Sequence, residues 1–291
     1  MLSMLADLKG PIMNGLLLGG LYGIVGIGMS MIFGIVRVVN LAHGDLVILA
    51  AYLSFVALSV FKVSPLLTLI LVIPAMFLIG YMIQYYLLNR VLGKDMNPPL
   101  LVAFGLSIIL QNLLRLIFTP DARALPTSLS IATIPLGSFL NVPVVYLVDF
   151  IGAVVTIFLL SLFFSTTYLG KAIRAASDDD GAAQIMGINT KRIYAWAMAI
   201  AGGTAAIAGV LVGMTFTFYP HTGPDYLIIA FGVVIIGGLG SLMGTLLGGL
   251  ILGLAQIIGA HFLGPGFQLL SGYIILLVVL SLKPTGLFSK G

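Results

Sequence analysis

The feature that most constrains this chain is a series of apolar runs, each long enough to cross a membrane. The first extends from Pro11 to Val36 without a charged residue. A helix needs about 20 mostly apolar residues to cross the hydrocarbon core of a bilayer. Because only helices and closed barrels satisfy every backbone hydrogen bond in lipid, such a run predicts a membrane helix. It is too long for the apolar region of a signal peptide, so we expect it to be retained.

Nine runs of this kind follow one another along the chain. They cover Pro11–Val36, Leu41–Phe61, Pro65–Leu88, Pro98–Phe118, Pro143–Ser165, Ile193–Phe218, Leu227–Leu242, Gly244–Phe262 and Phe267–Leu282. The seventh and eighth are short and almost continuous around Gly240, which predicts a broken or re-entrant pair. The sequence therefore predicts an all-α polytopic membrane protein with about eight to ten transmembrane helices.

Composition agrees with this class and excludes others. Hydrophobic residues make up 60% of the chain and charged residues 8%. Soluble domains average about 45–50% apolar and about 25% charged residues. No polar stretch is long enough for a second domain, so we expect residues 1–291 to form one transmembrane domain. The absence of cysteine excludes disulfides and thiolate-bound metal, and three scattered histidines without glutamate argue against a zinc or hydrolase site. The net charge of +4 fits loop orientation better than a nucleic-acid partner.

Orientation follows from lysine and arginine, which favour the cytoplasmic side in short loops. Residues 166–192 carry four of them, so we expect this loop in the cytoplasm. Counting crossings in both directions places two further pairs on the same side, Arg90 with Lys94 and Lys283 with Lys290. The Pro-rich loop 119–142 and the N-terminus are then expected outside, and a re-entrant segment near Asn40 would reverse the N-terminus.

Glycine recurs at four-residue spacing in several runs. Gly15, Gly19 and Gly23 form one such series, and Gly240, Gly244 and Gly248 form another. Small residues at this spacing let helices approach closely in lipid, where apolar side chains give no hydrophobic driving force. The pattern predicts tight helix packing or a subunit contact, and a glycine-lined passage is the alternative.

Seven of the 22 charged residues of the chain gather in one stretch, GKAIRAASDDDGAAQIMGINTKR, which starts at Gly170. Ser177 followed by Asp180 resembles a capping box, acidic residues favour a helix N-terminus, and Gly187 suits the position after a helix. We therefore predict a helix of about two turns from Asp178 to Met186. It is too short to be stable alone, since isolated helices need about 12–15 residues.

Something must therefore hold this helix in place. One alternative is an interfacial loop on lipid headgroups, but Asp178–Asp180 would be repelled by an anionic surface. Docking into the groove of a partner fits better. The residues predicted to take part are Ser177, Asp178, Asp179, Asp180, Ala182, Ala183, Ile185, Met186 and Gly187.

Several motifs resemble those of a known family. Ala182-Ala183 with Gly187-Ile188 matches part of the loop with which ABC importer permeases contact their ATPases, although the family's usual Glu is Gly181 here. Three further stretches match the smaller membrane subunit of branched-chain amino-acid ABC importers: Gly19–Tyr22 with Asn40–Asp45, Gly237–Ser241 with Gly244, and Lys283–Phe288. The resemblance covers nearly the whole chain, from Gly15 to Phe288, and does not exclude relatives that carry urea or short amides.

The resemblance implies a transport subunit of a bacterial inner membrane rather than an enzyme. A second, related permease would form a heterodimer with this chain, two ATPase subunits would bind Mg-ATP, and an extracytoplasmic binding protein would deliver leucine, isoleucine or valine. No cofactor is expected in this chain. Consistently, no G-x-x-x-x-G-K-[ST] phosphate-binding loop occurs in the sequence.

Polar residues at the break between the first two runs form a second candidate site. Polar groups near the bilayer are costly and by default line cavities, pair with one another or lie among headgroups. Asn40, His43, Gly44 and Asp45 are therefore either a plain cytoplasmic loop or a polar gate at the inner mouth of the passage. Gly238 and Gly240 are assigned to the same passage or gate.

Two charged residues within predicted spans offer a third candidate. Arg115 and Asp149 are expected at similar depth in consecutive antiparallel helices, so we predict an ion pair assisted by Gln111 and Asn112. Otherwise Arg115 extends to the headgroups and Asp149 faces a water-filled cavity.

Two other classes of protein remain as rivals. A secondary transporter or channel would need ionisable groups or discontinuous helices at mid-membrane and would have no use for the docking stretch. An intramembrane enzyme would need a nucleophile with a base, or a metal, which the sequence does not supply.

Overall fold

The computed structural model describes residues 8–93, 97–135, 141–283 and 286–288. Its elements, in chain order, are α2 (Lys9–Val36), α3 (His43–Phe61), α4 (Pro65–Met82), η1 (Ile83–Leu87), η2 (Leu88–Arg90), α5 (Asn97–Phe118), α6 (Ser128–Ile131), β1 (Thr133–Pro135), β2 (Asn141–Pro143), α7 (Val144–Thr166), α8 (Tyr168–Asp178), α9 (Asp180–Ile185), α10 (Thr190–Thr215), α11 (Gly223–Gly237), α12 (Leu242–Leu263), η3 (Pro265–Phe267) and α13 (Gln268–Leu282).

Eight helices of the described part are long and apolar enough to cross a membrane. The prediction of an all-α polytopic membrane protein is therefore confirmed. A two-stranded antiparallel hairpin, β1–β2, interrupts the helices. It lies in the loop 119–142, whose residues 136–140 are outside the described part, and the sequence did not predict it.

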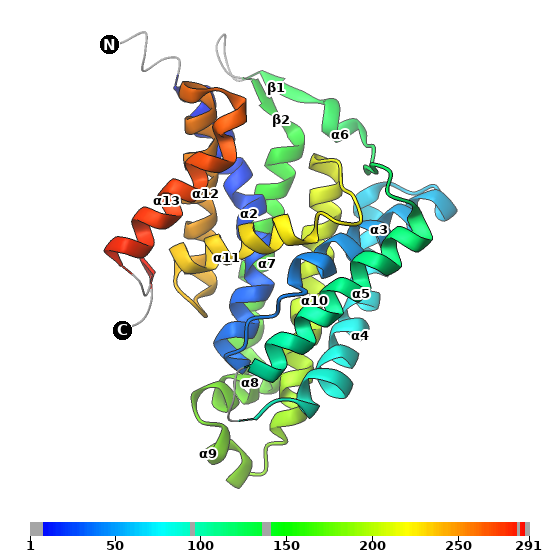
Figure 1. Cartoon of the computed structure of the whole chain (residues 1–291), viewed down its shortest axis with the longest axis vertical. Coiled ribbons are helices and arrows are strands. Elements are labelled where there is room, and N and C mark those ends of the chain that lie inside the picture. Colours follow the sequence, from blue (N-terminus) through cyan, green and yellow to red (C-terminus); the bar gives the residue numbers. More distant parts are fainter. Residues whose placement is uncertain (1–7, 94–96, 136–140, 284–285, 289–291) are drawn as a thin grey trace.

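Helices α2 and α10 form the centre of the bundle, and the other spans surround them (Figure 1). The four-residue glycine series lets α2 pack directly on α12. A side chain at Gly19 would place its first carbon 2.6 Å from the Cα of Leu250, which no real contact allows, and Gly249 and Gly253 lie against the same face of α2. The predicted tight helix packing is therefore confirmed for this series.

The two ends of the bundle carry different structures. The hairpin and α6 lie at the end where α2 begins, and α8 and α9 lie at the opposite end (Figure 1). Asn89, beside Arg90, donates a hydrogen bond to the Lys191 carbonyl, 2.9 Å away. Leu287 donates to the Ile236 carbonyl, 2.9 Å away. The turn at Arg90 thus lies at the same end as the start of α10, as the charge pattern predicted, while Lys94, Pro284, Thr285 and Lys290 are outside the described residues.

The region around Gly240 is only partly as predicted. Helix α11 has 15 residues, about 22 Å of helix, and is shorter than the roughly 30 Å of a bilayer core. It begins four residues before the predicted Leu227 because Pro224 is tolerated in the first turn of a helix. Gly238 and Gly240 form the break, with φ of 96° and 80°. Helix α12 is not short: it has 22 residues.

Candidate functional site

The charged stretch forms two helices rather than one. Helix α8 already includes Ser177 and Asp178, so the predicted capping role of Ser177 is wrong. Leu169, Ile173 and Ala176 recur on one face of α8 and pack on the bundle, which is the spacing of an amphipathic helix. This pattern was the signal for α8 that the sequence analysis missed.

Helix α9 starts and ends with standard capping structures. Asp179 is extended, and its carboxylate accepts a hydrogen bond from the Ala182 amide, 2.9 Å away. At the other end Gly187 has a φ of +83°, and the Ile188 amide donates to the Ala183 carbonyl at 3.0 Å, which is a Schellman motif. The backbone of this six-residue helix is therefore well defined at both ends.

The apolar side chains of α9 point away from the molecule. Ile185 is 87% exposed and Met186 is 81% exposed, whereas Ala183 is buried. Asp178, Asp179 and Asp180 are exposed as well. Full burial of an isoleucine or methionine side chain contributes about 1.5–3 kcal/mol, and Ile185 and Met186, at the end of α9, contribute little of this in the isolated chain.

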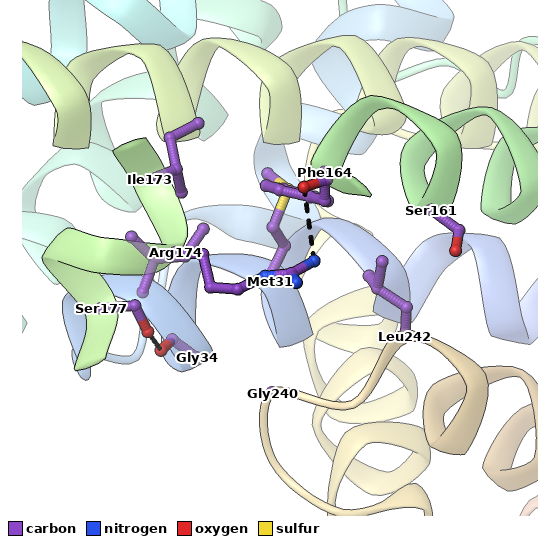
Figure 2. A pocket seen from close by; sticks show the side chains of 10 residues that line it. Met31, Gly34, Ser161, Phe164, Ile173, Arg174, Ser177, Gly240 and Leu242 are labelled. Carbon is purple, nitrogen blue, oxygen red and sulfur yellow. Dashed lines mark hydrogen bonds between the residues drawn. The ribbon is translucent and has the colours of Figure 1, made fainter. Parts of the chain in front are cut away.

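A chain of contacts leads from α8 into the bundle. The Ser177 hydroxyl donates a hydrogen bond to the Gly34 carbonyl of α2, 2.7 Å away. On its other side Gly34 lies against Gly240, where an added side chain would collide with the backbone. Figure 2 shows Ser177 beside Gly34 with the Gly240 turn opposite. The segment that precedes α9 is thus connected through Gly34 to the break between α11 and α12.

Residues Asn40–Asp45 lie in the middle of the bundle. The His43 Nε2 contacts the Val25 carbonyl at 2.9 Å, and Val25 lies about three turns, roughly 16 Å, from the end of α2. Asn40 is 2% exposed, and its side-chain oxygen accepts from the Ala42 amide at 3.1 Å. After α2 ends, the chain therefore returns to mid-depth before α3 begins. This depth of His43 differs from that of a plain loop at the end of the bundle, and the role of the segment as a gate stays a prediction.

Asp45 joins three helices at this depth. It is 2% exposed, and Ser107 of α5 donates a hydrogen bond to its Oδ2 at 2.5 Å. Its Oδ1 has no hydrogen-bond partner among the described residues and faces Gly223, the first residue of α11. A side chain at Gly44 would collide with the Gly223 carbonyl. We call Asp45, Ser107 and Gly223 the mid-span junction.

An apolar cavity of about 340 Å³ adjoins this junction. Its walls come from α2, the segment before α3, the start of α5, α11 and α13, and include Met29, Leu41, Leu100, Leu227 and Phe231. Leu227 follows Gly223 by one helical turn. The cavity therefore begins about one turn of α11 away from the Asp45 carboxylate.

The predicted ion pair between Arg115 and Asp149 is wrong. The only ion pair among the described residues joins Arg123 and Asp121, at 3.9 Å. Arg115 is exposed in the last turn of α5, which packs on α3. Asp149 is fully buried in α7 and accepts a hydrogen bond from Thr215 at 2.8 Å. Helix α7 packs on α2 and α10, so α5 and α7, although consecutive spans in the sequence, do not pack on each other.

Comparison with known proteins assigns the family. The model of the family described as "branched-chain amino acid transport system / permease component" matches residues 12–280. The chain belongs to this family.

The permease is 33% identical to the high-affinity branched-chain amino acid transport system permease protein BraD of Pseudomonas aeruginosa, over 96% of this chain and 95% of that one. It is 30% identical to LivH of Escherichia coli K12, a permease protein of the same description, over 95% of this chain and 94% of LivH. It is 28% identical to the ribose import permease protein RbsC of Haemophilus influenzae, over 88% and 79%.

A solved structure supports the fold. PsaBC from Streptococcus pneumoniae, in complex with Fab, has a TM-score of 0.51 and 12% sequence identity and covers 96% of the permease and 95% of its own chain. At this level of identity the likeness concerns the fold alone. The eight apolar helices and the family together make the protein a multi-pass membrane permease.

Proposed function

We propose that this permease is the membrane-spanning subunit of an ATP-driven importer that moves leucine, isoleucine or valine by alternating access. ATP would be bound and hydrolysed on two separate ATPase subunits. A second related permease would complete the passage, and an extracytoplasmic protein would deliver the substrate. Residues 166–192 and the C-terminus would face the cytoplasm of a bacterial cell, and loop 119–142 would face outward. The proposal rests above all on the exposed apolar pair of α9.

Docking of α9 explains why this pair is exposed. Ile185 and Met186 protrude beyond the end of the bundle, on a helix flanked by Asp178–Asp180 on one side and by Lys191 and Arg192 on the other. A groove in an ATPase subunit would bury the apolar pair, and charges on both sides would fix the orientation of the helix. Ala182 and Gly187 would let the partner approach closely.

A movement of α9 would be transmitted to the passage through a series of contacts. Ser177 is bonded to Gly34, Gly34 touches the Gly240 turn, and α11 leads from that turn to the Asp45 carboxylate. Because α11 is short and has a glycine break at one end, a shift of α8 and α9 would tilt it as a rigid unit. Asn40, His43, Gly44 and Asp45 would then act as the gate, with Gly238 and Gly240 as its hinge.

The apolar cavity supports the choice of substrate. Aliphatic and aromatic side chains line it almost entirely, and burying a branched hydrocarbon there is favourable. Urea and short amides would gain little from such a wall and would lose their hydrogen bonds to water. Branched-chain amino acids are therefore the better supported class.

Uptake measurements test this proposal. The permease, its ATPases, the second permease and the binding protein are expressed in cells that lack their own uptake systems, and radiolabelled leucine is supplied. We expect saturable uptake that unlabelled isoleucine and valine compete for and urea does not. Uptake of urea in preference to leucine would overturn the substrate class.

A further inference from the structure

A pocket between α2, α7, α8 and the Gly240 turn combines an apolar wall with a cation. It has a volume of about 210 Å³. Its wall includes the apolar side chains of Met31, Phe164 and Leu242, and Arg174, Ser161 and Ser177 supply side-chain polar groups (Figure 2). The pocket lies near the C-terminal ends of α2 and α7.

The guanidinium of Arg174 has no ion-pair partner within 4.0 Å in the described part of the chain, although the Asp178 carboxylate follows it by one turn of α8. Its one hydrogen bond is long, 3.4 Å from Nη2 to the Phe164 carbonyl, and the side chain forms no ion pair in the ranges that the structure covers. The Ser161 hydroxyl likewise donates to no side chain or backbone group of those ranges. Arg174 is exposed, so an anion could reach it from outside.

The pocket continues the lipid-facing surface of α7. Large apolar side chains of α7 are exposed along its length: Ile151, Val154, Val155, Phe158, Leu159 and Leu162. Ser161 follows Phe158 by three residues and therefore lies on the same face. At the end of this face the chain turns into α8, whose exposed Tyr168 suits the interface between lipid and water.

We propose that this pocket binds one anionic phospholipid, with its phosphate on Arg174 and one acyl chain along Phe164 and the exposed face of α7. Cationic pockets between helices at the membrane surface bind anionic headgroups, and the guanidinium can bind phosphate with two hydrogen bonds. A free phosphate would gain nothing from the apolar wall. The bound lipid would touch Ser177 and the Gly240 turn at the same time, and would therefore stabilise the connection that runs from α8 through Gly34 to the α11–α12 break.

Native mass spectrometry of the detergent-purified full chain tests the site. The chain is titrated with equal concentrations of phosphatidylglycerol and phosphatidylcholine, and we expect tighter retention of phosphatidylglycerol. Arg174→Gln should weaken phosphatidylglycerol binding about tenfold or more, because charged hydrogen bonds are strong. Leu242→Trp should weaken binding of both lipids by filling the pocket. Arg192→Gln, which removes an exposed cation outside the pocket, should have no effect.

Several results would overturn this proposal. Unchanged phosphatidylglycerol binding in both Arg174→Gln and Leu242→Trp would exclude the pocket, as would an equal loss in Arg192→Gln. If soluble glycerol phosphate displaced the lipid at equal concentration, the site would bind a phosphate group alone. Arg174 is exposed, so Arg174→Gln should keep the melting temperature of the wild type, which separates lost binding from lost folding.

Discussion

Removal of the two exposed side chains of α9 should weaken ATPase binding strongly and leave the permease folded. Ile185 and Met186 are 87% and 81% exposed, so the double change Ile185→Ala with Met186→Ala removes little from the isolated chain. On docking, each side chain would contribute about 1.5–3 kcal/mol through burial. After allowance for the methyl group that alanine retains, the double variant should lose about 2–4 kcal/mol of binding free energy, which is about 30- to 1,000-fold in affinity.

The assay measures the affinity of the purified ATPase subunits for the permease in lipid nanodiscs. Ile131→Ala is the matched control, because Ile131 is 86% exposed on α6 at the opposite end of the bundle. We expect this control to bind like the wild type and all variants to melt at the same temperature. A double variant within threefold of the wild type, or an equal loss in Ile131→Ala, would refute the docking surface.

Three further predictions concern packing, the junction and sidedness. Gly19→Leu should lower the free energy of unfolding by at least about 1–3 kcal/mol, because the Leu250 backbone occupies the space that the new side chain needs. In the control Gly105→Leu, no atom lies within 4 Å of the added side chain, so this variant should melt like the wild type. Ser107→Ala removes the donor to buried Asp45 and should cost about 1–3 kcal/mol, whereas Ser59→Ala, on an exposed helix end, should cost little. The chain has no cysteine, so Ile131→Cys and Met186→Cys each introduce a single thiol. In right-side-out and inverted vesicles, a membrane-impermeant reagent should label the two thiols from opposite sides. Labelling of both from the same side would contradict the proposed orientation.

The number and type of the helices could be predicted because each span carries its own signal. A run such as Pro65–Leu88 is apolar throughout, and no neighbour is needed to identify it. The position of α9 could also be predicted, since the acidic residues and Gly187 mark its two ends. Helix α8 was not predicted, because it is too polar to be a span, and its apolar positions Leu169, Ile173 and Ala176 alternate with charged residues.

The depth and the pairing of polar residues could not be predicted in the same way. Asn40–Asp45 follow the end of a span, and only tertiary contacts such as His43 with the Val25 carbonyl return them to the middle of the bundle. Arg115 and Asp149 seemed adjacent when the spans were laid out in sequence order, but α5 packs on α3 and α7 packs on α2 and α10. Which helices become neighbours depends on which helix faces fit together. The apolar runs of a single sequence do not indicate this fit.

The buried carboxylate of the mid-span junction raises the question of whether ATP or an ion gradient drives transport. A buried carboxylate beside the start of a short helix is also what an ion-coupled transporter would use, whereas the exposed pair of α9 fits the proposed docking of an ATPase. The most direct test is leucine uptake into proteoliposomes that contain the permeases with and without the ATPase subunits, under ATP or under a proton or sodium gradient. Our account predicts uptake only with the ATPases and ATP, and loss of that uptake in the Ile185→Ala, Met186→Ala double variant. Gradient-driven uptake by the permeases alone, unaffected by that double change, would contradict it.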